Sequence, residues 1–449
     1  KIRRNLLKVC TLLGLCHLST AVFALDGALT YERFARLNTP SQKVDATDWF
    51  ALEFDTERTG EEIDYHIETD LRFYPQESNY NYSIQEAYVE ETGGKHHWAI
   101  GRKVKDWAPH QTYWQLNYLN PQKGFNLLSQ EQEGLIGVHY DYRPHQEGFR
   151  FSGFFSYLYV PSLNPSIDIE NGNVSSTSEW QVLPPSQTVV NGTQVPIFYN
   201  LNMPPIEDII FQKSLGMSME YCWGSGKFKT YAIYKPESNV RQNAEAFYDI
   251  SNDRVEVTAN PIVNHHLMFG SSLHQNAHGV HYSAGFDVID PNAKVGEDFE
   301  PLGPLQLERS NRTFKSEFFT ISPSYDRESY GYLSAKVDRH LYDFSVNFIE
   351  ILSSNVRRAD DFFSDTVKFK RAVGFHVGLW ATNKLRLDAN LKYDIERKDN
   401  ILSGEMKYRF WQTMSLAMGV ELIKAPQANS YWGPYRDNDT VYGAFGYHF

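Results

Sequence analysis

The feature that most constrains the fold of this chain is a two-residue alternation of apolar and ionisable side chains that recurs along its length. From Ile63 to Phe73, every second residue is Ile, Tyr, Leu, Phe or Thr, and the residues between them are all ionisable. Comparable alternation returns at 373–379, 385–394 and 404–410. Successive side chains of a strand point to opposite faces, so each segment predicts a strand with one apolar and one polar face. A repeated set of such strands predicts a membrane barrel whose apolar face meets lipid.

The ionisable residues of these strands are expected to line the lumen of the barrel. They are Asp64, His66, Glu68, Asp70, Arg72, Arg386, Asp388, Lys392, Asp394, Glu405, Lys407 and Arg409. Both signs of charge are interleaved along them. One interpretation is a polar conduit with a transverse field, and another is a salt-bridged wall that holds the barrel in shape. The two interpretations are compatible.

Bulk composition agrees with this architecture, because a mean over the whole chain mixes the residues of the apolar face with those of the polar face. Hydrophobic residues make up 41% of the chain, and the mean hydropathy is −0.48. After residue 24, no apolar run approaches the roughly 18 residues that a spanning helix needs. Since only helices and closed barrels satisfy every backbone group in lipid, a membrane protein with this sequence must be a barrel.

The N-terminal segment has the features of a secretory signal peptide. Lys1, Arg3 and Arg4 form a basic region, 9–18 is a short apolar core, and Ala24 ends a stretch of small or modest residues. This order predicts a signal peptide at 1–24 and a mature barrel at 25–449, the alternative being a buried N-terminal helix. The expected location is the outer membrane of a Gram-negative-type bacterium.

Removal of that segment changes the charge and the cysteine content. It takes away four basic residues and no acid, so the formal charge moves from −12 to −16. An acidic balance argues against nucleic acid as a partner. Cys222 is the one cysteine after residue 24, which excludes an internal disulfide and a cysteine-based metal site in the mature chain. No cofactor and no metal are expected.

Short polar connections predict the number of strands. Eight of them resemble tight periplasmic turns: 58–60, 92–95, 143–148, 224–227, 276–279, 326–329, 381–384 and 411–413. The longest segments between them, at 105–132, 161–207, 236–265 and 289–313, are expected to be extracellular loops. With both termini in the periplasm, eight turns predict an all-β, antiparallel barrel of about 18 strands. This count requires 330–352 to be one overlong strand.

The last strand resembles the terminal strand that the bacterial barrel-assembly machinery recognises. Val441, Gly443, Phe445, Tyr447 and Phe449 alternate on one face. The resemblance implies that Phe445, Tyr447 and Phe449 form an assembly signal, with the assembly machinery as a partner.

Two internal stretches resemble paired strands of large single-chain porins and alginate-export-like porins. Residues 85–90 (QEAYVE) precede a Gly-Gly turn, and 98–103 (WAIGRK) lead toward Trp107. The resemblance covers about 25 residues plus the terminal strand, so it bears on the fold more than on a substrate. It implies a porin-like channel for passive diffusion of a small polar solute, and no enzyme. The resemblance does not decide whether the barrel forms a homo-oligomer or binds a partner at the cell surface.

The loop at 105–132 is the third on the long-loop side, and in porins the corresponding loop often folds into the lumen. It carries the residues expected at the pore constriction, which are Asp106, Trp107, Tyr113, Trp114 and Tyr118. Their aromatic rings can stack on sugar faces, or they can pack the loop against the barrel wall.

Two other functions stay open. In the first, the loops plug the lumen and the barrel is a surface interaction or assembly protein. In the second, the barrel is a hydrolase, because His281 and Ser283 resemble the H-x-S-x-G run of outer-membrane phospholipases. In that family the pair faces lipid, whereas here the apolar set at 280–288 predicts that His281 and Ser283 face the lumen.

Overall fold

A computed structural model describes residues 25–37, 46–58, 63–75, 79–91, 94–124, 126–145, 147–162, 167–176, 178, 180–291, 307–310, 313–321, 327–354, 367–428 and 430–449. The predicted signal peptide at 1–24 lies outside the described residues. Among the residues that are described, no helix is long and apolar enough to cross a membrane.

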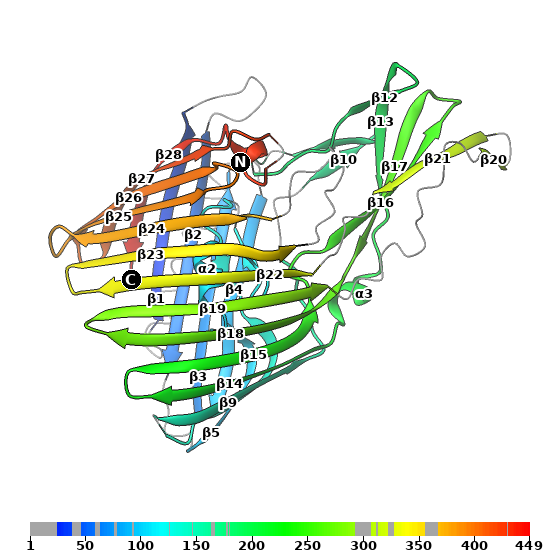
Figure 1. Cartoon of the computed structure of the whole chain (residues 1–449). Coiled ribbons are helices and arrows are strands. Elements are labelled where there is room, and N and C mark those ends of the chain that lie inside the picture. Colours follow the sequence, from blue (N-terminus) through cyan, green and yellow to red (C-terminus); the bar gives the residue numbers. More distant parts are fainter. Residues whose placement is uncertain are drawn as a thin grey trace.

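Eighteen antiparallel strands form one closed sheet, as the alternation and turns predicted (Figure 1). They are β1 (Leu25–Arg36), β2 (Ala46–Arg58), β3 (Ile63–Tyr74), β4 (Asn79–Glu91), β5 (His96–Lys103), β8 (Leu135–Tyr142), β9 (Gly148–Ser156), β14 (Ser214–Trp223), β15 (Gly226–Pro236), β18 (His265–Ala277), β19 (Val280–Pro291), β22 (Glu328–Asp338), β23 (Tyr342–Ser354), β24 (Arg371–Trp380), β25 (Leu385–Asp394), β26 (Asn400–Trp411), β27 (Met414–Lys424) and β28 (Thr440–His448). Strand β1 pairs with β2 on one side and with β28 on the other, so the sheet has no open edge.

Two predicted features of the connections were wrong, although the strand number was right. Glu328 and Ser329, which belong to the turn predicted at 326–329, instead begin β22. The segment 330–352, predicted as one overlong strand, contains the turn between β22 and β23. The turn is tight, because Arg339 and Tyr342 exchange backbone hydrogen bonds across it. The two errors offset each other, since each changed the count of short turns by one.

The two faces of the barrel differ as the alternation requires. Large apolar side chains stand exposed on the outer face, among them Ile100 at 67%, Ile63 at 58% and Met418 at 52%. Charged side chains such as Asp287 and Asp394 are buried on the inner face. An apolar band outside and a polar wall inside suit a barrel that crosses a bilayer.

Part of the long-loop side forms a second sheet outside the barrel, which the sequence had not predicted, since most of these residues were expected in extracellular loops. Its strands, in spatial order, are β12 (Gln187–Val190), β13 (Thr193–Leu201), β17 (Arg254–Ile262), β16 (Arg241–Asp249), β21 (Thr313–Ile321) and β20 (Leu307–Ser310). Figure 1 shows these strands projecting from the long-loop end of the barrel. A small core that includes Val195, Ile197 and Val255 holds the sheet together.

The remaining elements are short. They are the ribbons β6 (Gln122–Lys123) with β7 (Glu131–Gln132) and β10 (Asp168–Glu170) with β11 (Asn173–Ser175), and the helices α2 (Pro109–Trp114), α3 (Ile206–Ile210) and η1 (Gly433–Tyr435). The helix α2 and the β6–β7 ribbon belong to the segment 104–134 between β5 and β8, called the inward loop below.

Candidate functional site in the barrel lumen

The inward loop crosses the lumen, because its side chains bond to lumen-facing residues on widely separated strands. The loop leaves β5 and reaches β19, where Asp287 takes three polar contacts. His110 Nε2 lies 2.6 Å from Asp287 Oδ2, Gln111 donates to the same oxygen at 2.8 Å, and Tyr231 donates to Oδ1 at 2.6 Å. Asp287 is 1% exposed. A buried carboxylate with three partners fixes α2 against this wall, since losing a partner would leave a buried polar group unsatisfied.

The loop then returns along the opposite wall. Asn126 donates to Glu421 of β27 at 2.6 Å. Arg72 of β3 donates to Glu131 at 2.5 Å, and its Nε lies 2.6 Å from Asp70. Close to the end of the loop, Arg102 donates to Glu133 at 2.7 Å. The loop is therefore bonded to both sides of the barrel.

The neck of the inward loop is closed by a reciprocal pair of amide bonds. The backbone N–H of Lys105 donates to Asn120 Oδ1, and Asn120 Nδ2 donates to the carbonyl oxygen of Lys105. Burial lowers the pKa of the Lys105 ammonium to about 8. The same physical cause lowers the pKa of Lys368, whose Nζ donates to the carbonyl oxygen of Gln115 at 2.5 Å.

The structure separates the five residues predicted for the constriction. Trp107 is 2% exposed and packs beside Gly216 and Tyr231, whereas the side chain of Asp106 is 80% exposed. Trp114 is 1% exposed and lies 5.0 Å from the ring of Phe369.

The two tyrosines of the set reach other walls. Tyr113 is partly buried and contacts Gly374 of β24, and Tyr118 donates to Glu328 of β22 at 2.7 Å. The aromatic rings thus pack the loop against the barrel at different points, and the five side chains do not form one cluster.

A cavity of about 140 Å³ separates the inward loop from β25 and β26. It is lined by Tyr113, Gln115, Leu128, Asn390, Lys392, Ile401 and Ser403. The sequence had indicated Tyr113 and Lys392 for the lumen. Asn390 and Ser403 could have been found from the same alternation, but the position of Gln115 and Leu128 follows from how the loop folds.

The residues predicted to line the lumen lie on the inner face. On β3, Arg72 marks that face through its bond to the inward loop, and Asp64, His66, Glu68 and Asp70 share it. On β25, the Nζ of Lys392 lies 5.1 Å from the ring of Tyr113, and Arg386, Asp388 and Asp394 share its face. On β26, Glu405 and Lys407 lie opposite Asp388 and Arg386, and Arg409 follows on the same face.

These wall residues pair with one another to different degrees. Arg386 bonds Asp388 at 2.8 Å and Asp343 at 3.2 Å. Asp394 is fully buried and accepts backbone N–H groups of 370 and 396, whereas Lys407 and Arg409 stand exposed. Both earlier interpretations have support, since part of the wall is salt-bridged and part meets solvent.

One group of side chains in the described part of the chain has the composition and spacing of a metal centre. The ligand atoms of His66, Glu68 and Glu86 all lie within 4.8 Å of one another. His66 and Glu68 had been predicted as lumen residues, but Glu86 had not, because the pairing of β4 with β3 is what places it opposite Glu68.

The pair His281 and Ser283 faces the lumen, as the alternation predicted. His281 lies opposite Asn276 and bonds its Oδ1 through Nδ1, and Ser283 lies between His274 and Ser334. In the phospholipase family that the motif resembles, the pair faces lipid, so this chain departs from that arrangement.

Comparison with known proteins adds structural likeness alone. No protein-family model matches the chain, and no curated protein matches it in sequence. Pseudomonas aeruginosa OccK11 (OpdR) is similar in structure, with 9% identity and a TM-score of 0.46 over 95% of each chain. Acinetobacter baumannii OccAB3 has 9% sequence identity and a TM-score of 0.45, and the match covers 95% of this chain and 99% of that one. A triple mutant of the Rhodopseudomonas blastica porin has 9% sequence identity and a TM-score of 0.41, and the match covers 95% of this chain and 100% of that one.

A closed antiparallel barrel with an even number of strands and an apolar outer band is the architecture by which proteins cross the bacterial outer membrane. All connections at one end are short, and the long connections all lie at the other end. The chain is a closed, 18-stranded antiparallel β-barrel, and this is the architecture of outer-membrane barrels.

Proposed function

We propose that this protein is a channel through which small polar solutes diffuse passively across the outer membrane. The observation that carries the proposal is that ionisable side chains on the inner wall retain solvent exposure. The side chain of Glu68 is 42% exposed and that of Asp55, opposite it on β2, is 59% exposed. A wall of exposed charges inside a closed barrel requires water in the lumen, because dry charges would be costly. Water in the lumen is what a diffusing polar solute needs.

The inward loop sets the narrowest part of the proposed channel. It bonds to opposite walls and leaves the 140 Å³ cavity on the side of β25 and β26. The route that we propose passes through this cavity, between Gln115 on the loop and Lys392 and Asn390 on the wall. Hydrogen-bonding groups on both sides favour polar solutes over apolar ones.

A plugged barrel is the second candidate, and a specific cluster of aromatic rings favours it. Trp114 of the inward loop contacts Phe369, whose ring lies 6.0 Å from Trp432. Tyr435 of the same loop as Trp432 lies 5.7 Å from Trp180. Three other segments of the long-loop side therefore meet over the inward loop. With the projecting six-stranded sheet, this arrangement also suits a surface protein that conducts nothing.

Planar-bilayer recording with the purified barrel separates the candidates. A channel gives discrete conductance steps, and their reversal potential in a salt gradient gives the ion selectivity. Folded protein that inserts without steps would refute the channel and favour the plugged surface protein. We also propose that the protein is not an enzyme, which a lipase assay checks: hydrolysis that is lost in Ser283→Ala would contradict this.

A further inference from the structure

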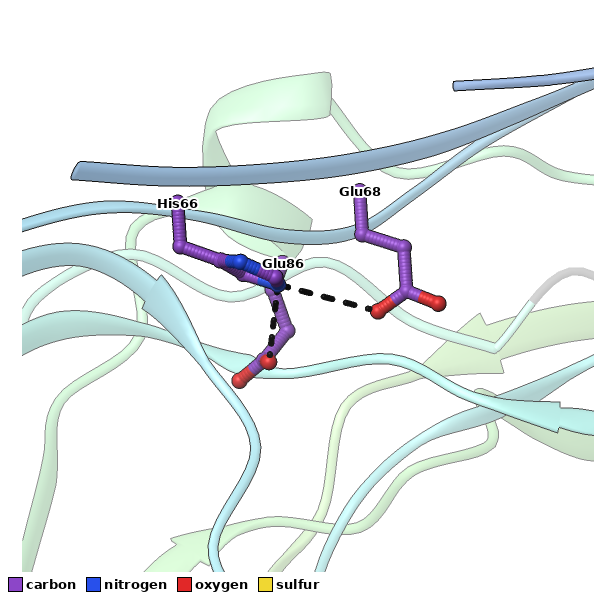
Figure 2. Close-up of side chains that lie close together, drawn as sticks. All are labelled: His66, Glu68 and Glu86. Carbon is purple, nitrogen blue, oxygen red and sulfur yellow. Dashed lines mark ion pairs between the residues drawn. The ribbon is translucent and has the colours of Figure 1, made fainter. Parts of the chain in front are cut away.

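Three side chains on the lumen face of β3 and β4 converge on one point (Figure 2). His66 and Glu68 come from β3, and Glu86 comes from β4. The Nε2 atom of His66 lies 3.5 Å from Glu86 Oε2 and 3.9 Å from Glu68 Oε2. One imidazole nitrogen thus faces two carboxylates at once.

The surrounding charges make a cation at this point favourable. Glu68 lies directly opposite Asp55 on β2 and directly opposite Glu86 on β4. Three carboxylates therefore form a row across three adjacent strands, all on the lumen face. Like charges directly opposite one another destabilise a sheet. Arg72, the nearest arginine on β3, is engaged by Asp70 and Glu131.

The atoms that do not face this point are turned toward other partners. His66 Nδ1 lies on the side of Asp55, 3.9 Å from its Oδ1, so Nε2 is the ring nitrogen that faces the centre. The backbone N–H of Val104 donates to Glu86 Oε1 at 2.6 Å, which leaves Oε2 for the centre. A histidine that ligates a metal commonly has such a carboxylate on its far nitrogen.

We propose that His66, Glu68 and Glu86 bind one divalent ion of the zinc class on the lumen wall. Two ligands held at about 2.1 Å by a tetrahedral ion lie about 3.4 Å apart, close to both nitrogen–oxygen distances here. The imidazole favours zinc and similar transition ions over calcium and magnesium, which prefer oxygen ligands alone. The side chains are 18%, 42% and 19% exposed, so water or a solute group in the lumen can take the remaining position.

The site also touches the root of the inward loop. Val104 precedes the buried Lys105, and its N–H bonds the carboxylate that would hold the ion. Binding of zinc would fix Glu86 and so support this contact. The site does not depend on the proposed channel function, because a plugged barrel would retain the same three side chains.

The test is isothermal titration of zinc into the folded, tag-free and chelator-treated barrel in detergent. We expect one site, weakened at least ten-fold in His66→Gln and in Glu86→Gln. The matched control is His274→Gln, which removes another lumen-facing histidine on β18 and should leave zinc affinity unchanged. Cobalt in place of zinc should give visible absorption bands that disappear in His66→Gln, and heat-modifiable gel migration shows that each variant is folded.

Two results would overturn the proposal. The first is equal zinc affinity in the wild type and in folded His66→Gln protein. The second is binding of calcium or magnesium as tight as that of zinc, because it would make the cluster a general counter-ion region with no role for the imidazole. Each of these results leaves the bilayer measurement unaffected, so the metal site and the channel can fail separately.

Discussion

His110 of the inward loop and Asp287 of β19 are joined by a contact of 2.6 Å, although 177 residues separate them in the chain. The carboxylate is buried and also accepts hydrogen bonds from Gln111 and Tyr231. This contact holds α2 in its position inside the barrel, so a substitution at Asp287 tests directly how the loop is held.

Replacing Asp287 with Ala should release α2 and increase both the single-channel conductance and its fluctuation. His110, Gln111 and Tyr231 would lose their common partner. Each of these groups that stays without a hydrogen bond would lower the free energy of unfolding by about 1–3 kcal/mol. Bilayer recording and the heat-modifiable transition measure the two effects. Asp290→Ala is the control, since its ion pair with Arg327 is exposed to solvent and contributes little to stability. Equal behaviour of the two variants would show that Asp287 does not hold the loop.

Shortening the inward loop between Pro109 and Gly124 should raise conductance at least about two-fold and admit larger solutes, because a constriction limits both. Conductance and the size cut-off for neutral polymers measure the change. If the folded deletion variant conducts like the wild type, the narrowest point lies elsewhere, and the long connection between β9 and β14 becomes the first suspect.

Lys368 should make stability rise with pH above about 7. Burial, with a smaller contribution from nearby Lys392, lowers the pKa of Lys368 from 10.5 to about 7. Between these values the unfolded chain holds one more proton than the folded protein, so raising the pH favours the folded state. Below pH 7 the buried amine is charged and the gain is absent. We expect the unfolding midpoint of Lys368→Met to rise less than that of the wild type between pH 6 and 9.

Lys370→Met provides the control for that comparison. Lys370 lies two residues from Lys368 and pairs with Glu396 at 3.4 Å, with 35% of its side chain exposed. Its variant should keep the pH dependence of the wild type. The same pH slope in the wild type and Lys368→Met would show that another group is responsible.

Gly27→Ala should weaken closure of the barrel at the β1–β28 seam. Gly27 and Phe449 exchange backbone hydrogen bonds of 3.0 and 2.9 Å, and the Phe449 ring occupies the space that a Cβ at Gly27 would need. Overpacking of this kind costs about 1–3 kcal/mol. Gly443→Ala on β28 is the control, because nothing lies within 4 Å of its added carbon. We expect slower assembly and a lower heat-modifiable midpoint for Gly27→Ala alone.

The outward position of Phe445, Tyr447 and Phe449 is compatible with the proposed assembly signal. The ring of Phe449 lies 6.3 Å from Phe54 and 6.1 Å from Tyr447. Phe449→Ala should therefore slow insertion into liposomes with the reconstituted assembly machinery. A rate equal to that of the wild type would limit Phe449 to packing at the seam.

The alternation by itself determined the barrel, the inner and outer faces and the inner position of residues such as Asp64 and Arg386. This was possible because the period of a strand is local: neighbours two apart share a face wherever the strand lies. The turn between β22 and β23 was missed because it is formed by Arg339, His340 and Leu341, without the Gly, Pro or Asn that usually marks a turn.

Only the tertiary structure decided what depends on contacts between distant segments. The segment of β21 reads like a barrel strand, yet it pairs with β16 in the outer sheet, and local alternation cannot distinguish two partners. Likewise, Trp107 and Trp114 are close in the chain but pack against β14–β15 and Phe369, because the loop path separates them. The row of Asp55, Glu68 and Glu86 also arises from the register of three strands, which the sequence of any one of them does not contain.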